Sequence, residues 1–152
     1  MPSRYYLTIE SKENYFSRRP LEDYGFNDKH RDEARLLEAG DLLVDYITGC
    51  GYACIMEIGK WETGIILREC PPDFTPTSPE YPWRVKVKVI LQIEHTFKMP
   101  KYKDLKEELE CCHEDKSLRR PLKNAQWMRG KNLIDISPQD FETIRKAISD
   151  IG

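Results

Sequence analysis

The sequence lacks a hydrophobic run long enough to cross a membrane, because no window approaches the roughly 20 apolar residues that a transmembrane helix needs. The segment after Met1 also has too little apolar length for a signal peptide. The chain also lacks a large excess of either positive or negative charge, since the formal net charge is −2 and the pI is about 6.0. We therefore expect a cytoplasmic protein with no membrane partner, in which any contact with nucleic acid uses a local basic patch.

Motifs of metal, cofactor and catalytic chemistry are also missing. The five cysteines are odd in number and form no CxxC pair, which favours reduced packing residues: Cys50, Cys54, Cys70, Cys111 and Cys112. Cys111-Cys112-His113 is the best candidate for a ligand cluster, but adjacent cysteines chelate one ion poorly. His30 and His95 have no partner at metal-site spacing. No GxSxG, P-loop or dinucleotide motif is present, so we expect no metal, no cofactor and no catalytic residue.

The first half of the chain reads as strand, loop, helix and hairpin. With 152 residues, of which 39% are hydrophobic, residues 1–152 can form one domain with a substantial core. Alternating apolar residues predict a strand over 5–10, followed by a turn over 11–14 and a polar loop to Gly25. Helical spacing predicts a helix over 28–38. Two apolar runs, 41–47 and 51–58, are separated by Thr48-Gly49-Cys50 and predict a hairpin.

The second half contains the clearest strand and a closing helix. Gly59 and Gly64 flank Trp61 and predict a bend, and five prolines between Cys70 and Pro82 predict a surface loop. From Trp83 to Ile93 the odd-numbered residues are apolar and we expect them to point one way. Helical spacing predicts a helix through Leu105, Leu109 and Cys112. Ser137-Pro138-Gln139-Asp140 starts a last helix, whose core face is Phe141, Ile144 and Ile148.

This order of elements excludes a regular βαβ alternation. It favours an α+β fold, with a small, curved, mixed and mostly antiparallel sheet, or open barrel, and helices packed on it.

Several segments carry the motifs of one known domain family, in the same order. Residues 4–14, Arg4-Tyr5-Tyr6-Leu7-Thr8-Ile9 and the turn after them, resemble the family's opening strand. Tyr24-Gly25-Phe26 resembles its aromatic-glycine segment, and Ala39-Gly40-Asp41 its "GD" turn. The strand over 81–87 and the closing segment over 127–141 follow in the family's order. Together these segments resemble the EVE domain family, which belongs to the PUA-like group and is related to YTH domains. The resemblance implies a PUA-like pseudo-barrel.

What the resemblance implies for function is a pocket that holds a flipped, often modified, nucleobase. An extruded base offers two π-faces and a hydrogen-bonding edge, which aromatic and polar side chains can hold. By position, the implied ligand-binding residues are Tyr6, Ser11, Asn14, Tyr24, Phe26, Tyr46, Thr48, Trp127 and Arg129. Many family members have tryptophan at the positions of Tyr6 and Tyr24, so the resemblance specifies neither the base nor its modification, nor DNA against RNA.

Three hypotheses follow for function. The first is a module that binds a methylated base in nucleic acid, with Trp127 as a stacking residue and Arg84, Lys86, Lys88 and Lys131 on the backbone. An exposed strand face also carries charges simply to stay solvated, which is the alternative for the basic stripe. The second hypothesis is a small-molecule or nucleotide sensor with the same pocket, which the near-neutral charge favours. The third, a catalyst, would need a pocket carboxylate or histidine with a shifted pKa.

Overall fold

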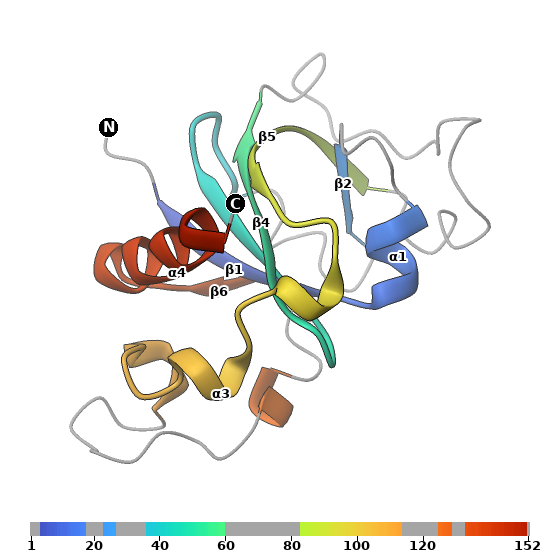
Figure 1. The fold of residues 1–152 in the computed structure, drawn as a ribbon. Helices are drawn as coiled ribbons and strands as arrows, with labels where there is room; N and C mark the ends of the chain where they lie inside the picture. The colour runs from blue at the N-terminus through green and yellow to red at the C-terminus, as the bar shows by residue number, and fades with distance from the viewer. Residues whose placement is uncertain are drawn as a thin grey trace.

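A curled six-stranded sheet organises the protein. The computed structural model describes residues 4–17, 23–26, 36–59, 83–113, 125–128 and 133–151. Its strands, in sheet order, are β2 (Asp23–Phe26), β5 (Trp83–Gln92), β4 (Gly51–Ile58), β3 (Leu42–Ile47), β1 (Tyr5–Glu10) and β6 (Leu133–Asp135). β1 runs parallel to β3, and the other neighbouring strands are antiparallel. The predicted mixed, mostly antiparallel sheet is confirmed, and Figure 1 shows it curling into a half-barrel.

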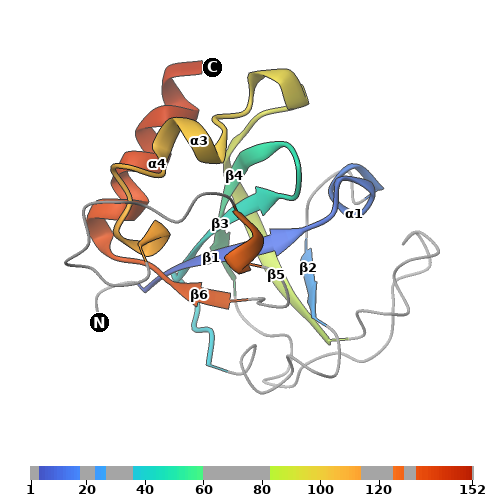
Figure 2. The ribbon, with the colours of Figure 1, turned by 90° about the horizontal axis from the view of Figure 1, so that it is seen from below.

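Short helices surround the sheet. The described α-helices are α1 (Lys12–Ser17), α3 (Tyr102–Leu105) and α4 (Pro138–Ile151), and the 3₁₀ turns are η4 (Thr96–Lys98), η5 (Glu110–Cys112) and η6 (Ala125–Met128). Both ribbon views place α3 and α4 together at one side of the sheet and α1 beside β2 at the other (Figures 1 and 2). Two regions in which predicted site residues lie are therefore separate, one near α3 and α4 and the other near α1 and β2.

Both faces of the central strands are buried. Tyr5 stacks on Phe141 of α4, with ring centroids 4.6 Å apart, so the sheet face that carries Tyr5 and Leu7 is the α4 face. Because side chains alternate along a strand, Tyr6 and Thr8 point to the opposite face. Leu7 on the first face and Leu43 on the second are both fully buried. The core therefore lies on both sides of the sheet, as expected for a half-barrel.

The "GD" turn has a structural explanation. Gly40 has a φ of +96°, a left-handed conformation that glycine adopts without steric cost. The buried carboxylate of Asp41 accepts hydrogen bonds from the backbone N–H groups of Arg4, at 3.1 Å, and Glu38, at 2.9 Å. Asp41 thus joins the start of β1 to the turn before β3, which stabilises their parallel pairing.

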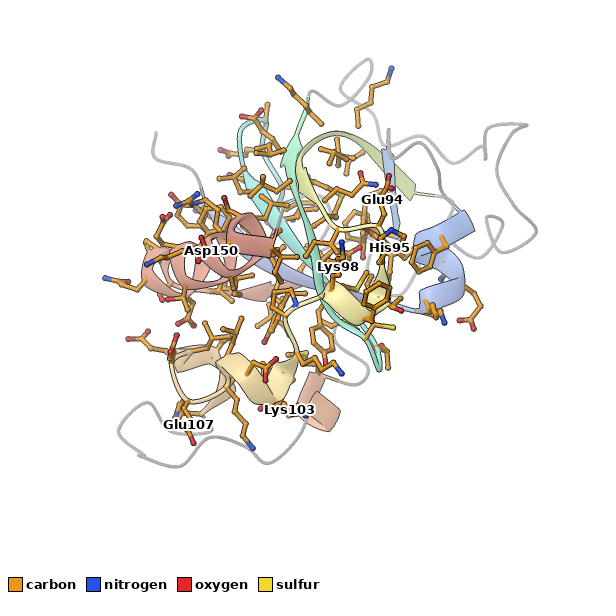
Figure 3. All side chains as sticks on the ribbon, in the orientation of Figure 1. Glu94, His95, Lys98, Lys103, Glu107 and Asp150 are labelled. Atoms are coloured by element: carbon orange, nitrogen blue, oxygen red, sulfur yellow. The ribbon has the colours of Figure 1, made fainter. Side chains whose placement is uncertain are left out.

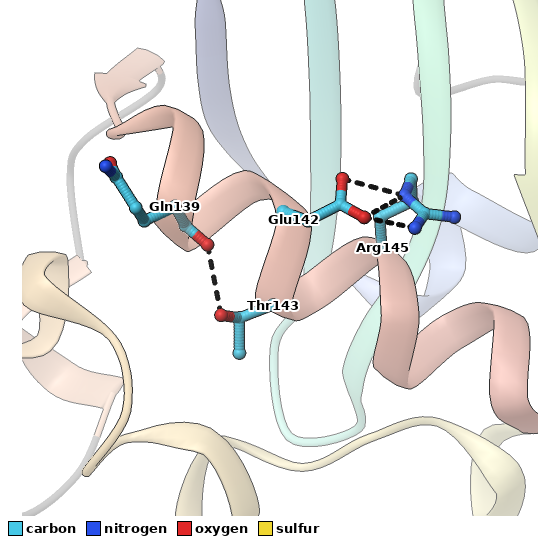
Figure 4. A network of polar contacts seen from close by, with 4 residues as sticks. All are labelled: Gln139, Glu142, Thr143 and Arg145. Atoms are coloured by element: carbon cyan, nitrogen blue, oxygen red, sulfur yellow. Dashed lines mark hydrogen bonds and ion pairs between the residues drawn. The ribbon is translucent and has the colours of Figure 1, made fainter.

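α4 forms as its sequence predicts. The backbone N–H of Asp140 donates to the Oγ of the cap residue Ser137 at 3.0 Å, and Phe141, Ile144 and Ile148 are buried. The outer face carries local polar pairs, shown in Figure 4. The Arg145 guanidinium binds the Glu142 carboxylate, and the hydroxyl of Thr143 donates to the carbonyl of Gln139 at 3.0 Å.

The region after β1 differs from the prediction of a turn and a polar loop. Residues 12–17 form α1 and residues 23–26 form β2. α1 has only six residues, too few to be stable alone. It forms because the fully buried Tyr15 anchors it to the core, with its hydroxyl donating to the Ile93 carbonyl at 3.2 Å. Tertiary packing thus overrides a weak local signal.

The helix predicted through Leu105, Leu109 and Cys112 is also wrong, although all three residues are buried. The chain forms α3, leaves the helical conformation at Leu109 and resumes as η5. The carboxylate of Asp140 accepts the backbone N–H groups of Glu110, at 2.8 Å, and Cys111, at 2.9 Å. In a continuous helix these N–H groups would bond to carbonyls four residues earlier, so Asp140 replaces that helical pairing.

β5 contains a bulge that the alternating pattern conceals. Val89 pairs with Met56 and Leu91 with Ile55, which leaves Ile90 as an extra residue. Because Met56 and Ile55 are neighbours on β4, they point to opposite faces, and so do their partners. The prediction that Val89 and Leu91 point the same way is therefore wrong beyond the bulge, and Ile90 is 48% exposed.

Some predictions lie outside the described residues. These are most of the helix over 28–38, the bend at Trp61 and the proline-containing loop over 70–82; residues 36–38, which are described, are not helical. Cys50, Cys111 and Cys112 are free cysteines. Among the described residues, no group of three or more His, Cys, Asp or Glu side chains could hold a metal ion. Within those same ranges no helix is both long and apolar enough to span a bilayer.

Candidate functional site

Three of the predicted polar residues meet where β1 ends and α1 begins. The Oγ of Ser11 accepts the backbone N–H of Asn14 at 3.1 Å, which caps the first turn of α1. The backbone N–H of Thr48 donates to the carbonyl of Glu10 at 3.0 Å, so the β3–β4 turn lies against the same junction. Ser11 and Asn14 are half-buried and Thr48 is exposed. We call Ser11, Asn14 and Thr48 the junction residues.

The predicted aromatic residues of β2 form a pair. The rings of Tyr24 and Phe26 have centroids 5.2 Å apart and are tilted by 54°. Tyr24 pairs with Val85 of β5, so it points to the sheet face opposite α4. Its side chain is only 3% exposed, and that of Phe26 is fully buried. Both ribbon views place β2 beside α1, which brings the aromatic pair to the same end of the molecule as the junction residues (Figures 1 and 2).

A buried polar pair occupies the same face of the sheet. The hydroxyl of Thr8 donates to Oδ1 of Asp45 at 3.0 Å, and both residues have no exposed surface. They are register partners on β1 and β3. Sequence reasoning missed this pair, although a threonine and an aspartate on apolar strands are an unusual combination that signals a buried hydrogen bond.

Tyr6 and Tyr46 do not join this group. Tyr6 lies five residues before Ser11, or about 16 Å along an extended strand. It sits beside Arg4, where its hydroxyl raises the pKa of that guanidinium. Tyr46 pairs with Ile9, so its ring points to the α4 face, where it packs edge-on against Tyr52 at 5.0 Å. The structure therefore divides the predicted aromatic residues between two faces of the sheet.

Trp127 belongs to a second cluster on the α4 face. Its ring is half-buried and its Nε1–H donates to the hydroxyl of Tyr102 at 3.0 Å. Burial raises the pKa of Tyr102 and of Tyr52, with the neighbouring Cys112 thiol adding to the effect. The hydrogen bond to Cys112 and burial raise the pKa of Cys111. Tyr52, Tyr102 and Cys111 therefore stay protonated at neutral pH, whereas hydrogen bonds from Cys111, Tyr102 and Tyr52 lower the pKa of Cys112.

The predicted basic residues lie apart from the aromatic pair. Lys86 and Lys88 are exposed on β5. They alternate with Val85 and Val87, whose side chains share a sheet face with Tyr24, so the lysines point to the other face. Only the backbone of Arg84 is described, opposite Gly25, while Arg129 and Lys131 lie outside the described residues. The backbone-binding role of all four residues stays a prediction.

Solved structures with the same architecture are YTH domains and proteins without a stated function. The chain is similar to the Pho92 YTH domain in complex with m6A, with a TM-score of 0.62 and 13% identity over 96% of this chain and 83% of that one. These likenesses establish the fold. The PUA-like α+β fold expected from the sequence is thereby confirmed, as the YTH-like fold.

Two further structures support the same conclusion. The Toxoplasma CPSF4 YTH domain in complex with a 7-mer m6A-modified RNA has a TM-score of 0.64 and 10% identity, over 98% of this chain and 93% of that one. A hypothetical protein from Leishmania major has a TM-score of 0.58 and 18% identity, over 98% and 96%. No protein-family model and no curated protein matches the sequence.

Proposed function

We propose that the chain is an EVE-type RNA-binding module that holds a modified, flipped base and performs no chemistry on it. The observation that carries the proposal is the likeness of 96% and 98% of the chain to two YTH domains solved with m6A or m6A-modified RNA. Because the sequence identity with these two domains is only 13% and 10%, we infer the ligand from the residues of this chain. The junction residues and the β2 aromatic pair are the groups that a base would need.

The physical logic of the site separates two tasks. Ser11, Asn14 and Thr48 offer hydroxyl and amide groups that can bind the hydrogen-bonding edge of an extruded base. Tyr24 and Phe26 offer ring faces for stacking, each base–aromatic stack being worth about 1–3 kcal/mol. Because Tyr24 is 3% exposed and Phe26 is buried, binding requires a local movement that uncovers a ring face. We expect association slower than the diffusion limit for this reason.

The placement of the family-like motifs supports the EVE assignment. Asp41 of the "GD" turn binds the backbone at the start of β1, and Ser11 of the opening segment caps α1. Ser11 thus builds the junction, whereas Asp41 acts at the opposite end of β1. Family-like motifs that each have a structural role in one fold favour family membership over chance similarity.

A binding titration tests this function. Labelled single-stranded RNAs that differ only in one adenosine or m6A should bind the wild type with at least about tenfold preference for m6A, the value of one methyl group in an apolar pocket. Asn14→Ala should weaken the binding of both RNAs, because it removes an amide that can bind the edge of the base. Glu13→Gln is the matched control, since Glu13 is exposed on the same turn of α1. Equal affinity of the wild type for both RNAs would contradict the proposal.

A nucleotide sensor is the second candidate. The net charge of −2 favours it, because a protein that grips a polynucleotide usually carries an excess of positive charge. Binding of free m6A nucleotide with the same affinity as RNA, and with little dependence on salt, would favour the sensor.

A further inference from the structure

An exposed aromatic pair lies between β5 and α3. The ring of Phe97 is 75% exposed, the largest exposed fraction among the large hydrophobic residues that the structure describes. The imidazole of His95, also exposed, stacks on it with centroids 5.4 Å apart and an interplanar angle of 30°. Such a pair leaves aromatic surface in water, which folding by itself does not favour.

The segment that carries this pair is held at both ends by the β3–β4 hairpin. The backbone N–H of Ile93 donates to Ala53 at 2.9 Å, and the N–H of Tyr52 donates to the carbonyl of Pro100 at 2.9 Å. Met99 and Pro100 are buried, and η4 closes the segment with its own backbone hydrogen bonds. Phe97 therefore lies on a turn that backbone hydrogen bonds fix in place, so a base that stacks on it would restrict few additional rotatable bonds of the protein.

Three lysines lie close to the pair in the sequence. Lys98, Lys101 and Lys103 are exposed within six residues of Phe97 in the sequence. Figure 3 shows His95 and Lys98 on the segment after β5 and Lys103 on α3 below them. The acids nearby are Glu94, which is exposed, and Asp104, whose carboxylate accepts the backbone N–H of Lys101 at 3.3 Å. Aromatic rings beside lysines match the stacked bases and phosphates of a single strand.

The segment adjoins the proposed base site. Ile93, two residues before His95, accepts the hydrogen bond from Tyr15 of α1, and α1 begins at the junction residues. An RNA strand whose modified base is held at the junction would therefore have its neighbouring nucleotides near His95 and Phe97. We propose, on the basis of the proposed function, that the His95–Phe97 pair stacks a nucleotide next to the modified base, with Lys98 binding its phosphate.

A protein partner fits the surface less well. The exposed large hydrophobic residues in the described ranges are Leu36, Ile90, Phe97 and Ile151, and they lie on four different segments. Phe97 is the one exposed large hydrophobic residue of the described segment 93–100, whereas a stable protein interface is built on a contiguous apolar area. A single aromatic pair bordered by lysines is sufficient for one base.

The sequence signal for the site is a phenylalanine in the polar run Glu94-His95-Thr96-Phe97-Lys98.

The test compares Phe97→Ala with the wild type on single-stranded 9-mer RNAs with a central m6A or adenosine, and on the free m6A nucleoside. Loss of one stacking contact should weaken both 9-mers by about 5- to 100-fold. The m6A preference and the affinity for the nucleoside should not change, because the base site remains. Phe97→Trp should retain 9-mer binding. Ile90→Ala, which removes another exposed apolar side chain, is the matched control and should change nothing.

The outcomes separate this proposal from the function on which it rests. If the wild type prefers m6A but Phe97→Ala binds the 9-mers equally well, the stacking site is wrong and the base site stands. If the wild type shows no m6A preference, the proposed function fails, whatever Phe97→Ala does. A wild type that dimerises in sedimentation, and a Phe97→Ala variant that is monomeric with unchanged RNA affinity, would overturn the stacking site in favour of a protein interface.

Discussion

The hydroxyl of Tyr15 donates a hydrogen bond of 3.2 Å to the backbone carbonyl of Ile93. This contact joins α1, which begins at the proposed base site, to the segment that displays His95 and Phe97. Both partners are buried, so the bond is shielded from competition by water. It therefore helps to hold the two proposed RNA-binding regions in a fixed relation.

Removing the Tyr15 hydroxyl tests that role. We expect Tyr15→Phe to lower the free energy of unfolding by about 1 kcal/mol or more, because it leaves a buried carbonyl without its donor. Tyr52→Phe is the contrast, since in the described part of the chain the buried Tyr52 hydroxyl has no oxygen or nitrogen partner and only the weakly accepting Cys112 sulfur beside it. That change should be neutral or stabilising. Urea denaturation measures both, and equal destabilisation by the two changes would contradict the assignment.

Gly51 holds the hairpin against the segment after β5. Its φ is +145°, and a Cβ there would lie 2.3 Å from the carbonyl oxygen of Pro100. Gly51→Ala should therefore destabilise the fold by about 2–3 kcal/mol and weaken 9-mer binding together with it. Gly49→Ala is the matched control, because Gly49 has a φ of +78° but, apart from its chain neighbours, no described residue has an atom within 4 Å of the added Cβ. It should cost only the backbone term of about 1 kcal/mol in urea unfolding; the same loss at both sites would show that contact with Pro100 is unimportant.

Asp140 joins α4 to η5 by hydrogen bonds. Asp140→Ala removes a buried carboxylate that accepts two backbone N–H groups, and we expect a loss of about 2–4 kcal/mol in the free energy of unfolding. Asp150→Ala removes an exposed carboxylate from the same helix and should change stability by less than about 0.5 kcal/mol. Thermal unfolding followed by circular dichroism measures both variants. A small effect of Asp140→Ala would mean that η5 satisfies its N–H groups with water.

The Glu142–Arg145 pair predicts a small dependence of stability on pH. The hydrogen bond and charge of Arg145 lower the pKa of Glu142 below its ordinary value. A carboxylate with a lowered folded-state pKa stabilises the protein above its unfolded pKa of about 4.3, and the effect disappears as pH falls through the folded value. Glu142→Gln should therefore have a slightly lower Tm than the wild type at pH 7. The two Tm values should converge near pH 2.5; a constant difference at both pH values would exclude the ion pair as its cause.

The sequence by itself determined the elements whose stabilising contacts are local or periodic. The β3–β4 hairpin and α4 appear where turn residues, the Ser137 cap and apolar spacing placed them. The mixed, mostly antiparallel α+β architecture follows from the order of those elements. Of the nine ligand-binding residues that the family resemblance implies, the junction of β1 and α1 brings Ser11, Asn14 and Thr48 together, and their binding role stays a prediction.

Only the tertiary structure decided the features that depend on a partner distant in sequence. α1 exists because Tyr15 is buried against β5, and the chain breaks before η5 because Asp140, 29 residues beyond Cys111, takes its N–H. The bulge at Ile90 is set by pairing with β4, so no pattern within β5 reveals it. Strand register likewise sends Tyr46 and Tyr24 to opposite faces of the sheet. The physical reason is the same throughout: these positions are fixed by hydrogen bonds and packing between segments, which local spacing does not encode.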